Sequence, residues 1–421
     1  MARRGIREYD TKRILASALG QDSPRLALVG PGQSLVSLSK EHPWIETEKL
    51  VVKPDQLFGK RGKHGLIGVN LTMNEAEDWI AQRAGKEVTL GRITGSLTHF
   101  LVEPFVAHEA EYYLAMRTFM DKDTIFLSAK GGVDVEEHWD EVVTLDVPVG
   151  AKLDQRALRS RLADLFGNEQ VPVLEKWINA LYRVFVAGHF AYFEINPFAL
   201  VDGRVHALDA VAKVDDTAEF EAREIWGDLE FPIPFGRTFS PEEQRIAELD
   251  ARTGASLKLS VLNPEGVIWT MVAGGGASVI YADTITDLGF GHELANYGEY
   301  SGNPNKEMTY QYAATILDLM TRKKDSAGRR KVLLIGGGIA NFTDVAKTFT
   351  GIIQAIREYA PRLKETGVDI YVRRGGPNYK TGLERMRALG DELGIPIHVY
   401  GPETHMTHIV TLALDRLGGA Q

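Results

Sequence analysis

Two glycine-rich turns have the composition of an anion-binding site. Glycines at 336–338 follow the apolar run 331–335, and glycines at 274–276 follow the apolar run 267–273. A turn of this kind between a strand and a helix exposes backbone N–H groups at the positive end of the helix dipole, which attracts carboxylates and phosphates. The alternative is that the glycines only allow close packing of strand and helix. Because the arrangement occurs twice, we expect both turns to flank one crevice at the carboxyl ends of parallel strands.

Polar side chains accompany the later turn. Asn341 and Thr343 follow it and add hydrogen-bond donors, and Arg373 and Arg374 end another strand of the same region. A guanidinium can bind a carboxylate through two parallel hydrogen bonds. Adjacent arginines on a surface turn are usually only solvated, and this is the alternative. Together with the glycine turns, the arginines favour an acidic ligand.

The first half of the chain has its own group of cations. Lys53 follows an apolar strand, and the segment Arg61-Gly62-Lys63 lies shortly after it. This arrangement would bring cations and backbone donors to nucleotide phosphates, although it is not the P-loop pattern. A solvated basic turn is the alternative.

A predicted hairpin carries two oxygen ligands. Asn196 and Asp209 end short apolar runs that are joined at Asp202-Gly203, so a hairpin would place them side by side. Carboxamide and carboxylate oxygens suit Mg²⁺ that is held jointly by protein and phosphates. An ordinary asparagine turn is the alternative.

The hydrophobic pattern predicts an α/β protein with two domains. Strands at 50–52 and 101–102 alternate with helices at 75–83 and 174–186 in an α+β first half, and a proline-rich stretch at 218–244 reads as a connector. From residue 257 onward, strands alternate with glycine turns and helices, which predicts a parallel sheet covered on both faces. A buried helical stripe predicts a helix that begins near Asn341. The stripe consists of Val345, Phe349, Ile352, Ile353 and Ile356.

Composition narrows the function classes. The 421 residues include 57 acidic and 48 basic side chains, so nucleic acid is not an expected partner. The absence of cysteine excludes disulfides, thiolate metal sites and a cysteine nucleophile, and it fits a cytoplasmic location. No apolar run reaches the ~20 residues that a membrane helix needs, so we expect no membrane association.

Four motifs of the first half resemble the ATP-grasp part of the succinyl-CoA synthetase β-subunit superfamily. These motifs are VKPDQL at 52–57, GGVD at 131–134, EINP at 194–197 and LD at 208–209. The resemblance implies an ATP-grasp fold at residues 1–225, followed by a linker at 226–256.

Within that superfamily, the sequence is most similar to the N-terminal part of ATP-citrate lyase, which in some microbes is a separate subunit. The matching segments are GASLKL at 254–259, WTMVAGGGAS at 269–278, ELANYGEYSG at 293–302, IANFT at 339–343 and VRRGGPNY at 372–379. The match runs from about His42 to the end and leaves the first 40 residues without a counterpart. It implies a flavodoxin- or Rossmann-like parallel-sheet domain that binds citrate at residues 257–421.

The resemblance implies a role for individual residues. ATP would be bound by Lys53, Arg61, Gly62, Pro104, Val106 and Glu111. Mg²⁺ would be held by Asn196 and Asp209, and a further cation site falls on Asp250, Thr253 and Ala255, where threonine replaces the serine of the animal enzyme. Citrate would be bound by Gly302, Asn341, Phe342, Thr343 and Arg374, with Tyr359 nearby.

The resemblance also implies a partner subunit. In this family ATP phosphorylates a histidine that passes the phosphoryl group to citrate, and coenzyme A then forms citryl-CoA, which a lyase domain cleaves. The sequence contains neither the Gly-His-Ala-Gly-Ala segment that carries this histidine nor a lyase domain. The partner of the expected hetero-oligomer would therefore supply the histidine, most of the coenzyme A site and a citrate-synthase-like lyase centre. Glu194 would orient the visiting histidine, and Lys53 and Arg61 would offset charge on the transferring group.

Two other functions stay open at this point. One is the β-subunit of a succinyl-CoA or citryl-CoA synthetase without cleavage activity, although the segments 339–343 and 373–374 favour citrate. The other is a regulatory protein that binds a nucleotide and a tricarboxylate without chemistry.

Overall fold

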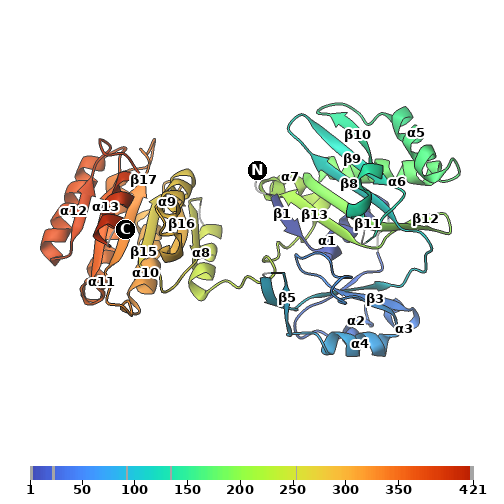
Figure 1. The fold of residues 1–421 in the computed structure, drawn as a ribbon, viewed down its shortest axis with the longest axis horizontal. Helices are drawn as coiled ribbons and strands as arrows, with labels where there is room; N and C mark the ends of the chain where they lie inside the picture. Colours follow the sequence, from blue (N-terminus) through green and yellow to red (C-terminus); the bar gives the residue numbers. More distant parts are fainter. Residues whose placement is uncertain (1–2, 21–23, 92, 133–134, 253, 418–421) are drawn as a thin grey trace. The chain divides into compact units, whose positions relative to one another are not determined.

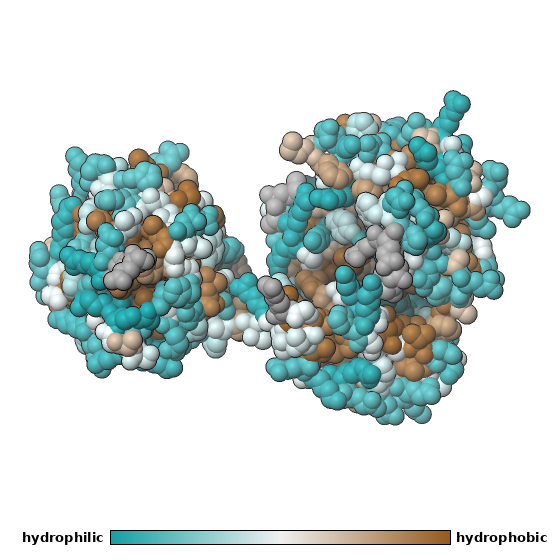
Figure 2. All heavy atoms as spheres, in the orientation of Figure 1, coloured by the Kyte–Doolittle hydropathy of each residue, from teal (hydrophilic) through white to brown (hydrophobic). Residues whose placement is uncertain are grey.

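The computed structural model describes residues 3–20, 24–91, 93–132, 135–252 and 254–417. The chain forms two compact units, Met1–Thr238 and Phe239–Gln421, each of mixed α/β structure (Figure 1). Among the described helices, none is long and apolar enough to cross a membrane. In Figure 2 hydrophilic residues cover most of the face in view, and the hydrophobic residues are scattered in separate groups.

The larger sheet of the first unit has seven strands, and its paired strands are antiparallel. Its order is β1-β13-β11-β8-β9-β10, with β12 beside β11. The strands are β1 (Arg3–Ile6), β8 (Tyr112–Thr118), β9 (Lys122–Ser128), β10 (Val143–Pro148), β11 (Phe190–Val201), β12 (Arg204–Ala207) and β13 (Ala210–Asp215). The helices that bury apolar residues against it are α1 (Glu8–Ala18), α5 (Gln155–Phe166), α6 (Val171–Ala187) and α7 (Glu219–Trp226). In α6 the stripe Leu174, Ile178, Leu181 and Phe185 follows the helical period and is fully buried, which explains why this segment is a packed helix.

The smaller sheet has four antiparallel strands in the order β2-β7-β3-β4. These are β2 (Ala27–Val29), β3 (Leu50–Pro54), β4 (Gly68–Leu71) and β7 (Phe100–Pro104), and β5 (Glu87–Leu90) with β6 (Ile93–Ser96) forms a separate hairpin. The helices α2 (Leu35–Leu38), α3 (Trp44–Thr47) and α4 (Met73–Ala81) contribute residues to its hydrophobic cluster. A reciprocal cap between Thr72 and Glu75 fixes the start of α4.

The first 40 residues are part of this unit. They supply β1 at the edge of the larger sheet, β2 at the edge of the smaller sheet, and α1, whose Ile14 and Leu15 are buried. The resemblance found in the sequence began near His42, so it did not predict these elements.

The second unit is a parallel sheet with one antiparallel edge strand. Its order is β14-β16-β15-β17-β18-β19, in which only β14 runs antiparallel to its neighbour. Numbered along the chain, the five parallel strands have the order 2-1-3-4-5 of the flavodoxin-like doubly wound folds, as predicted. The strands are β14 (Ser256–Val261), β15 (Ile268–Ala273), β16 (Asn296–Ser301), β17 (Lys331–Gly337), β18 (Val368–Arg373) and β19 (Ile397–Tyr400).

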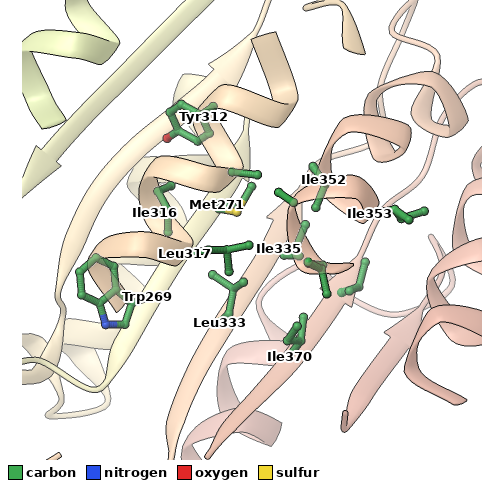
Figure 3. Close-up of a cluster of buried hydrophobic side chains, with 14 of the residues drawn as sticks. Trp269, Met271, Tyr312, Ile316, Leu317, Leu333, Ile335, Ile352, Ile353 and Ile370 are labelled. Atoms are coloured by element: carbon green, nitrogen blue, oxygen red, sulfur yellow. The ribbon is translucent and has the colours of Figure 1, made fainter. Parts of the chain in front are cut away.

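Helices cover both faces of this sheet. On one face α8 (Pro241–Ala251), α10 (Lys306–Thr321), α11 (Val345–Thr366) and α12 (Tyr379–Leu393) share a cluster with alternate strand residues such as Met271 and Ile335, drawn in Figure 3. On the other face α9 (Gly275–Asp287) and α13 (His408–Arg416) pack on the intervening residues, such as Val272 and Leu334. Because successive side chains of a strand point to opposite faces, both sets are buried. Short 3₁₀ turns occur at Val135–Glu141, Asp216–Ala218 and Gly291–Glu293.

Two boundaries differ from the sequence prediction. The range 226–256, expected as a linker, contains α8, whose Ile246 is buried in the core of the second unit. The helix expected near Asn341 begins at Val345, because the Asp344 side chain accepts a hydrogen bond from the Lys347 N–H and caps the helix there.

Candidate functional site

A pocket of about 270 Å³ lies at the carboxyl ends of the strands of the second unit. It opens where the strand order reverses, between β15 and β17, which is where doubly wound folds bind ligands. Both predicted glycine turns contribute to it. The lining residues are Ala273, Gly274, Ala277, Tyr300, Ser301, Gly302, Pro304, Gly338, Ile339, Ala340, Phe342, Thr343 and Arg374.

Four of the six residues predicted to bind citrate line this pocket, namely Gly302, Phe342, Thr343 and Arg374. Asn341 is exposed on the same loop as Phe342, and its side chain is not part of the lining. The loops that carry Asn341 and Arg374 lie side by side, since the Ala340 N–H donates to the Gly375 carbonyl at 2.9 Å. The structure therefore brings together segments that are more than thirty residues apart in the sequence.

Tyr359 does not belong to this group. It lies in the middle of α11, about 21 Å along the helix axis from Val345, given the 1.5 Å rise per residue. Its ring lies under the Arg362 guanidinium at 5.2 Å.

The two adjacent arginines have different surroundings. Arg373 is held by three backbone carbonyls, donating to Gly337 and Thr404 at 2.9 Å and to Pro402 at 3.3 Å. Among the described residues, the Arg374 guanidinium donates only to the Gly338 carbonyl, at 2.7 Å, and no carboxylate pairs with it. Burial lowers the pKa of Arg374, and the nearby tyrosines 281 and 300 act against this. Arg374 thus presents a buried cation with unused donors to the pocket.

The helix ends at the pocket also differ. The start of α11 is occupied by Asp344, whose carboxylate accepts from Lys347 N–H at 2.9 Å and from Asn378 Nδ2 at 2.7 Å. The start of α9 has Gly274 at a φ of 101° as its cap residue and no side-chain cap. Its free N–H groups make α9 the anion-receptive helix, although the Glu299 carboxylate beside Gly275 offsets part of its dipole.

A buried network of charges occupies the predicted nucleotide site in the first unit. The Lys53 ammonium lies 2.6 Å from a Glu8 oxygen and 2.9 Å from Glu103. The Arg61 guanidinium lies 2.6 Å from Glu8 and also pairs with Asp209. Lys12 of α1 joins the network through Glu8 at 2.8 Å and Glu103 at 2.7 Å. Every cation of this group therefore has an internal carboxylate partner.

The network shifts the titration of its members. Burial acts to raise the pKa of Glu8, but the charges of Lys12, Lys53 and Arg61 outweigh it and hold the pKa well below its ordinary value. Burial acts to lower the pKa of Lys53, and the carboxylates of Glu103 and Glu8 raise it instead. Burial and the Glu8 charge raise the pKa of Asp209 to about 6. Lys53 thus stays charged at neutral pH.

The hairpin of β11 and β12 places Asn196 and Asp209 together. The Asn196 N–H donates to the Asp209 carbonyl at 3.2 Å, and the Asn196 Oδ1 accepts from Gly132 N–H at 2.7 Å. Their oxygens are hard ligands of the type that Mg²⁺ prefers, and the Asp209 carboxylate keeps a second oxygen besides the one that Arg61 contacts, so the residues present fit the ion. Glu194 lies two residues before Asn196 on the same face of β11, and its carboxylate accepts from the Tyr192 hydroxyl.

Three of the residues expected to bind ATP, namely Pro104, Val106 and Glu111, lie where the two sheets of the first unit are joined. Pro104 ends β7 of the smaller sheet, and Tyr112 begins β8 of the larger one. Val106 and Glu111 lie in this connection, and His108 bridges the Val106 carbonyl and the Glu111 carboxylate. Gly62 follows Arg61 in the loop between β3 and β4.

Of the residues predicted for a further cation site, the structure describes Asp250 and Ala255. Thr253 lies outside the described residues. The Asp250 carboxylate accepts from the Leu257 N–H at 2.7 Å and from Lys258 Nζ at 2.6 Å, so protein groups already use it. Ala255 packs against Gly302 at the edge of the pocket.

Sequence reasoning missed three residues of the charge network, Glu8, Lys12 and Glu103, and several residues of the pocket, among them Tyr300. Glu8 and Lys12 are four residues apart at the start of a helix, a spacing that indicates an ion pair and nothing about the distant Lys53. Only the fold brings them together.

Comparisons with known proteins agree over nearly the whole chain. Residues 2–226 match the ATP-citrate synthase ATP-grasp domain, and residues 237–416 match the ATP citrate lyase citrate-binding domain. ATP-citrate synthase alpha chain protein 2 of Arabidopsis thaliana is 48% identical over all of both chains. Human ATP-citrate synthase is 49% identical over 98% of this chain, which spans 38% of that longer protein.

A solved structure gives the same result. The ATP citrate lyase chain from Methanothrix soehngenii, determined in complex with citrate and coenzyme A, is 52% identical, with a TM-score of 0.88 over 98% of this chain and all of that one. The chain described here belongs to the ATP-citrate lyase family.

Proposed function

We propose that this chain is the subunit of an ATP-citrate lyase that binds Mg-ATP and citrate and phosphorylates a histidine of a partner subunit. The complete reaction converts ATP, citrate and coenzyme A to ADP, phosphate, acetyl-CoA and oxaloacetate. The observation that carries the proposal is the buried Arg374 guanidinium, which has no carboxylate partner among the described residues and lies in a pocket at the switch point of the sheet. A carboxylate of citrate would be the anionic partner of this guanidinium.

The pocket has the donors that citrate needs. Arg374 binds one carboxylate through its free N–H groups, and the backbone N–H groups after Gly274 and the Thr343 hydroxyl bind others. Glycine at 302, with a φ of 70°, lets the chain pass close to the ligand, and a side chain there would meet Ala255. Phe342, which is 70% exposed, forms an apolar rim.

In the first unit, Lys53 and Arg61 neutralise the phosphates of ATP. Phosphoryl transfer depends on positioning and charge neutralisation more than on covalent chemistry by the protein. Glu8 and Glu103 fix the two cations before ATP arrives, so little reorganisation is needed. Asn196 and Asp209 would hold Mg²⁺, which offsets charge on the phosphates when it is bound.

The phosphoryl group would move in two steps. The histidine nitrogen of the partner attacks the γ-phosphorus, ADP leaves, and Glu194 orients the imidazole. A citrate carboxylate oxygen in the second unit then attacks the phosphohistidine, which regenerates histidine and gives citryl phosphate. The N-terminus of α9 stabilises the negative phosphoryl group during this step. The thiol of coenzyme A finally displaces phosphate to form citryl-CoA.

The relatives support a partner of this kind. The human relative carries this region as 38% of a single longer polypeptide, whereas the plant relative named alpha chain matches this chain from end to end. The remaining part of the reaction would here reside on a second chain. In this nomenclature the chain corresponds to an alpha chain, although the synthetase relatives call the equivalent subunit β.

The test combines this chain with a candidate partner. We expect ATP hydrolysis that requires both citrate and coenzyme A, transfer of the γ-phosphoryl group of labelled ATP to the partner, and formation of oxaloacetate. Formation of citryl-CoA without oxaloacetate would identify a synthetase instead. Hydrolysis with succinate in place of citrate would contradict the assignment of the pocket.

A further inference from the structure

Tyr300 lines the pocket of Arg374, and its hydroxyl is buried without a hydrogen-bond partner among the described groups. Tyr300 lies in β16 and is 2% exposed. The residue is held firmly, because its carbonyl accepts from the Gly274 N–H at 3.2 Å and its ring packs against Tyr312 at 5.9 Å. A buried polar group without a partner is unfavourable, so its presence requires an explanation.

The unit contains an internal comparison for this feature. The Tyr371 hydroxyl is also buried without a partner, and Tyr371 is 1% exposed. Tyr371 stacks on His398 at 4.6 Å and belongs to the cluster on the α9 and α13 face of the sheet. It does not line the pocket.

We propose that the Tyr300 hydroxyl donates a hydrogen bond to the carboxylate that Arg374 binds, and that Tyr300 is therefore a further substrate-binding residue. The inference rests on the proposed function, since it assumes an acid in this pocket. A carboxylate is an acceptor only, and it could use the unpaired donors of the guanidinium and of the phenol together. Burial raises the pKa of Tyr300 although Arg374 acts to lower it, so the hydroxyl keeps its proton at neutral pH.

The geometry gives the hydroxyl a selective role. Both donors come from rigid positions, Tyr300 from the end of one strand and Arg374 from the residue after β18. A ligand that fills the pocket without a carboxylate at this point would leave a buried hydroxyl and a buried cation unpaired, which disfavours its binding.

The test is isothermal titration calorimetry of citrate into the full chain and its variants. We expect Tyr300→Phe to raise the Kd for citrate about tenfold, the size of effect that one hydrogen bond to a charged group has. Tyr371→Phe should leave the Kd unchanged. Both variants should unfold at the same or a higher temperature than the wild type, because each loses an unpaired buried hydroxyl. With the partner present, Tyr300→Phe should raise KM for citrate and not for ATP.

The outcomes separate the inference from the function on which it rests. If Tyr300→Phe binds citrate as tightly as the wild type while Arg374→Ala does not, the inference is wrong and the pocket assignment stands. If Arg374→Ala also binds normally, the pocket assignment and the proposed function fall together. If Tyr300→Phe and Tyr371→Phe weakened citrate binding equally, the effect would be one of general packing, and the proposed role of Tyr300 would be wrong.

Discussion

The two candidate sites of this chain solve the same problem, binding an anion, in opposite ways. In the first unit Lys12, Lys53 and Arg61 are each paired with internal carboxylates. In the second unit Arg374 and the Tyr300 hydroxyl are buried and have no such partner in the part of the chain that the structure describes. The first site is thus part of what holds its unit together, whereas the second keeps its polar groups available for a ligand. Substitutions should therefore affect stability in one site and affinity in the other.

The largest expected effect is that of Lys53→Ala. Removing one member of a buried ion-pair network leaves Glu8 and Glu103 with less compensation, which typically costs about 3–5 kcal/mol. We expect a much less stable first unit and no phosphorylation of the partner, with citrate affinity retained by the second unit. Chemical unfolding and citrate titration measure both. The control is Lys122→Ala, which removes an exposed pair with Asp146 and should change stability little.

Glu8→Gln should show how the network depends on pH. The folded pKa of Glu8 is depressed, so its stabilisation is present above the ordinary value of 4.5 and is lost as the pH falls toward the folded pKa. The variant should therefore be less stable than the wild type at pH 7, by roughly 3 kcal/mol. The difference should shrink on acidification, which urea unfolding at several pH values would measure. A constant difference would mean that shape, and not charge, makes Glu8 important.

Arg373 and Arg374 are adjacent, and they allow a direct comparison of a cation that stabilises the fold with a cation that is available to a ligand. Arg374→Ala should raise the Kd for citrate about 100-fold, because about 1.5–3 kcal/mol is expected for hydrogen bonds to a charged group. Arg373→Ala should instead lower the free energy of unfolding by about 1–3 kcal/mol, since three buried or partly buried carbonyls lose their donor. If both variants lost only stability, Arg374 would be structural as well.

The smallest expected effect is that of Asp344→Ala. This variant removes the cap of α11 and should cost about 1 kcal/mol of stability. Citrate affinity should be unchanged or higher, because a carboxylate near the pocket is removed. Weaker citrate binding would show that the capped start of α11 matters for the ligand, contrary to the assignment of the anion-receptive end to α9.

Much of the second unit could be predicted from its sequence. The alternation of β-branched runs with glycine turns predicted the parallel sheet, and the structure confirms it. The strand expected at 267–273 is found at Ile268–Ala273, because its residues are buried on both faces and this leaves a continuous apolar run. The start of α11 was misplaced, since the glycine turn continues as a loop until the Asp344 cap.

The pairing of polar groups in the two candidate sites depends on tertiary structure more than the fold of the second unit does. The sequence alone established the family, the order of the domains and the glycine turns, because these are written in local spacing and in motifs that stand in order along the chain. Only the tertiary structure decided that Glu8 neutralises Lys53, that Asp344 closes one helix end, and that Tyr300 remains unpaired beside Arg374. Which buried polar groups pair with each other depends on which strand ends and helix ends meet in space. The sequence around each residue does not show this when the partners lie far apart along the chain.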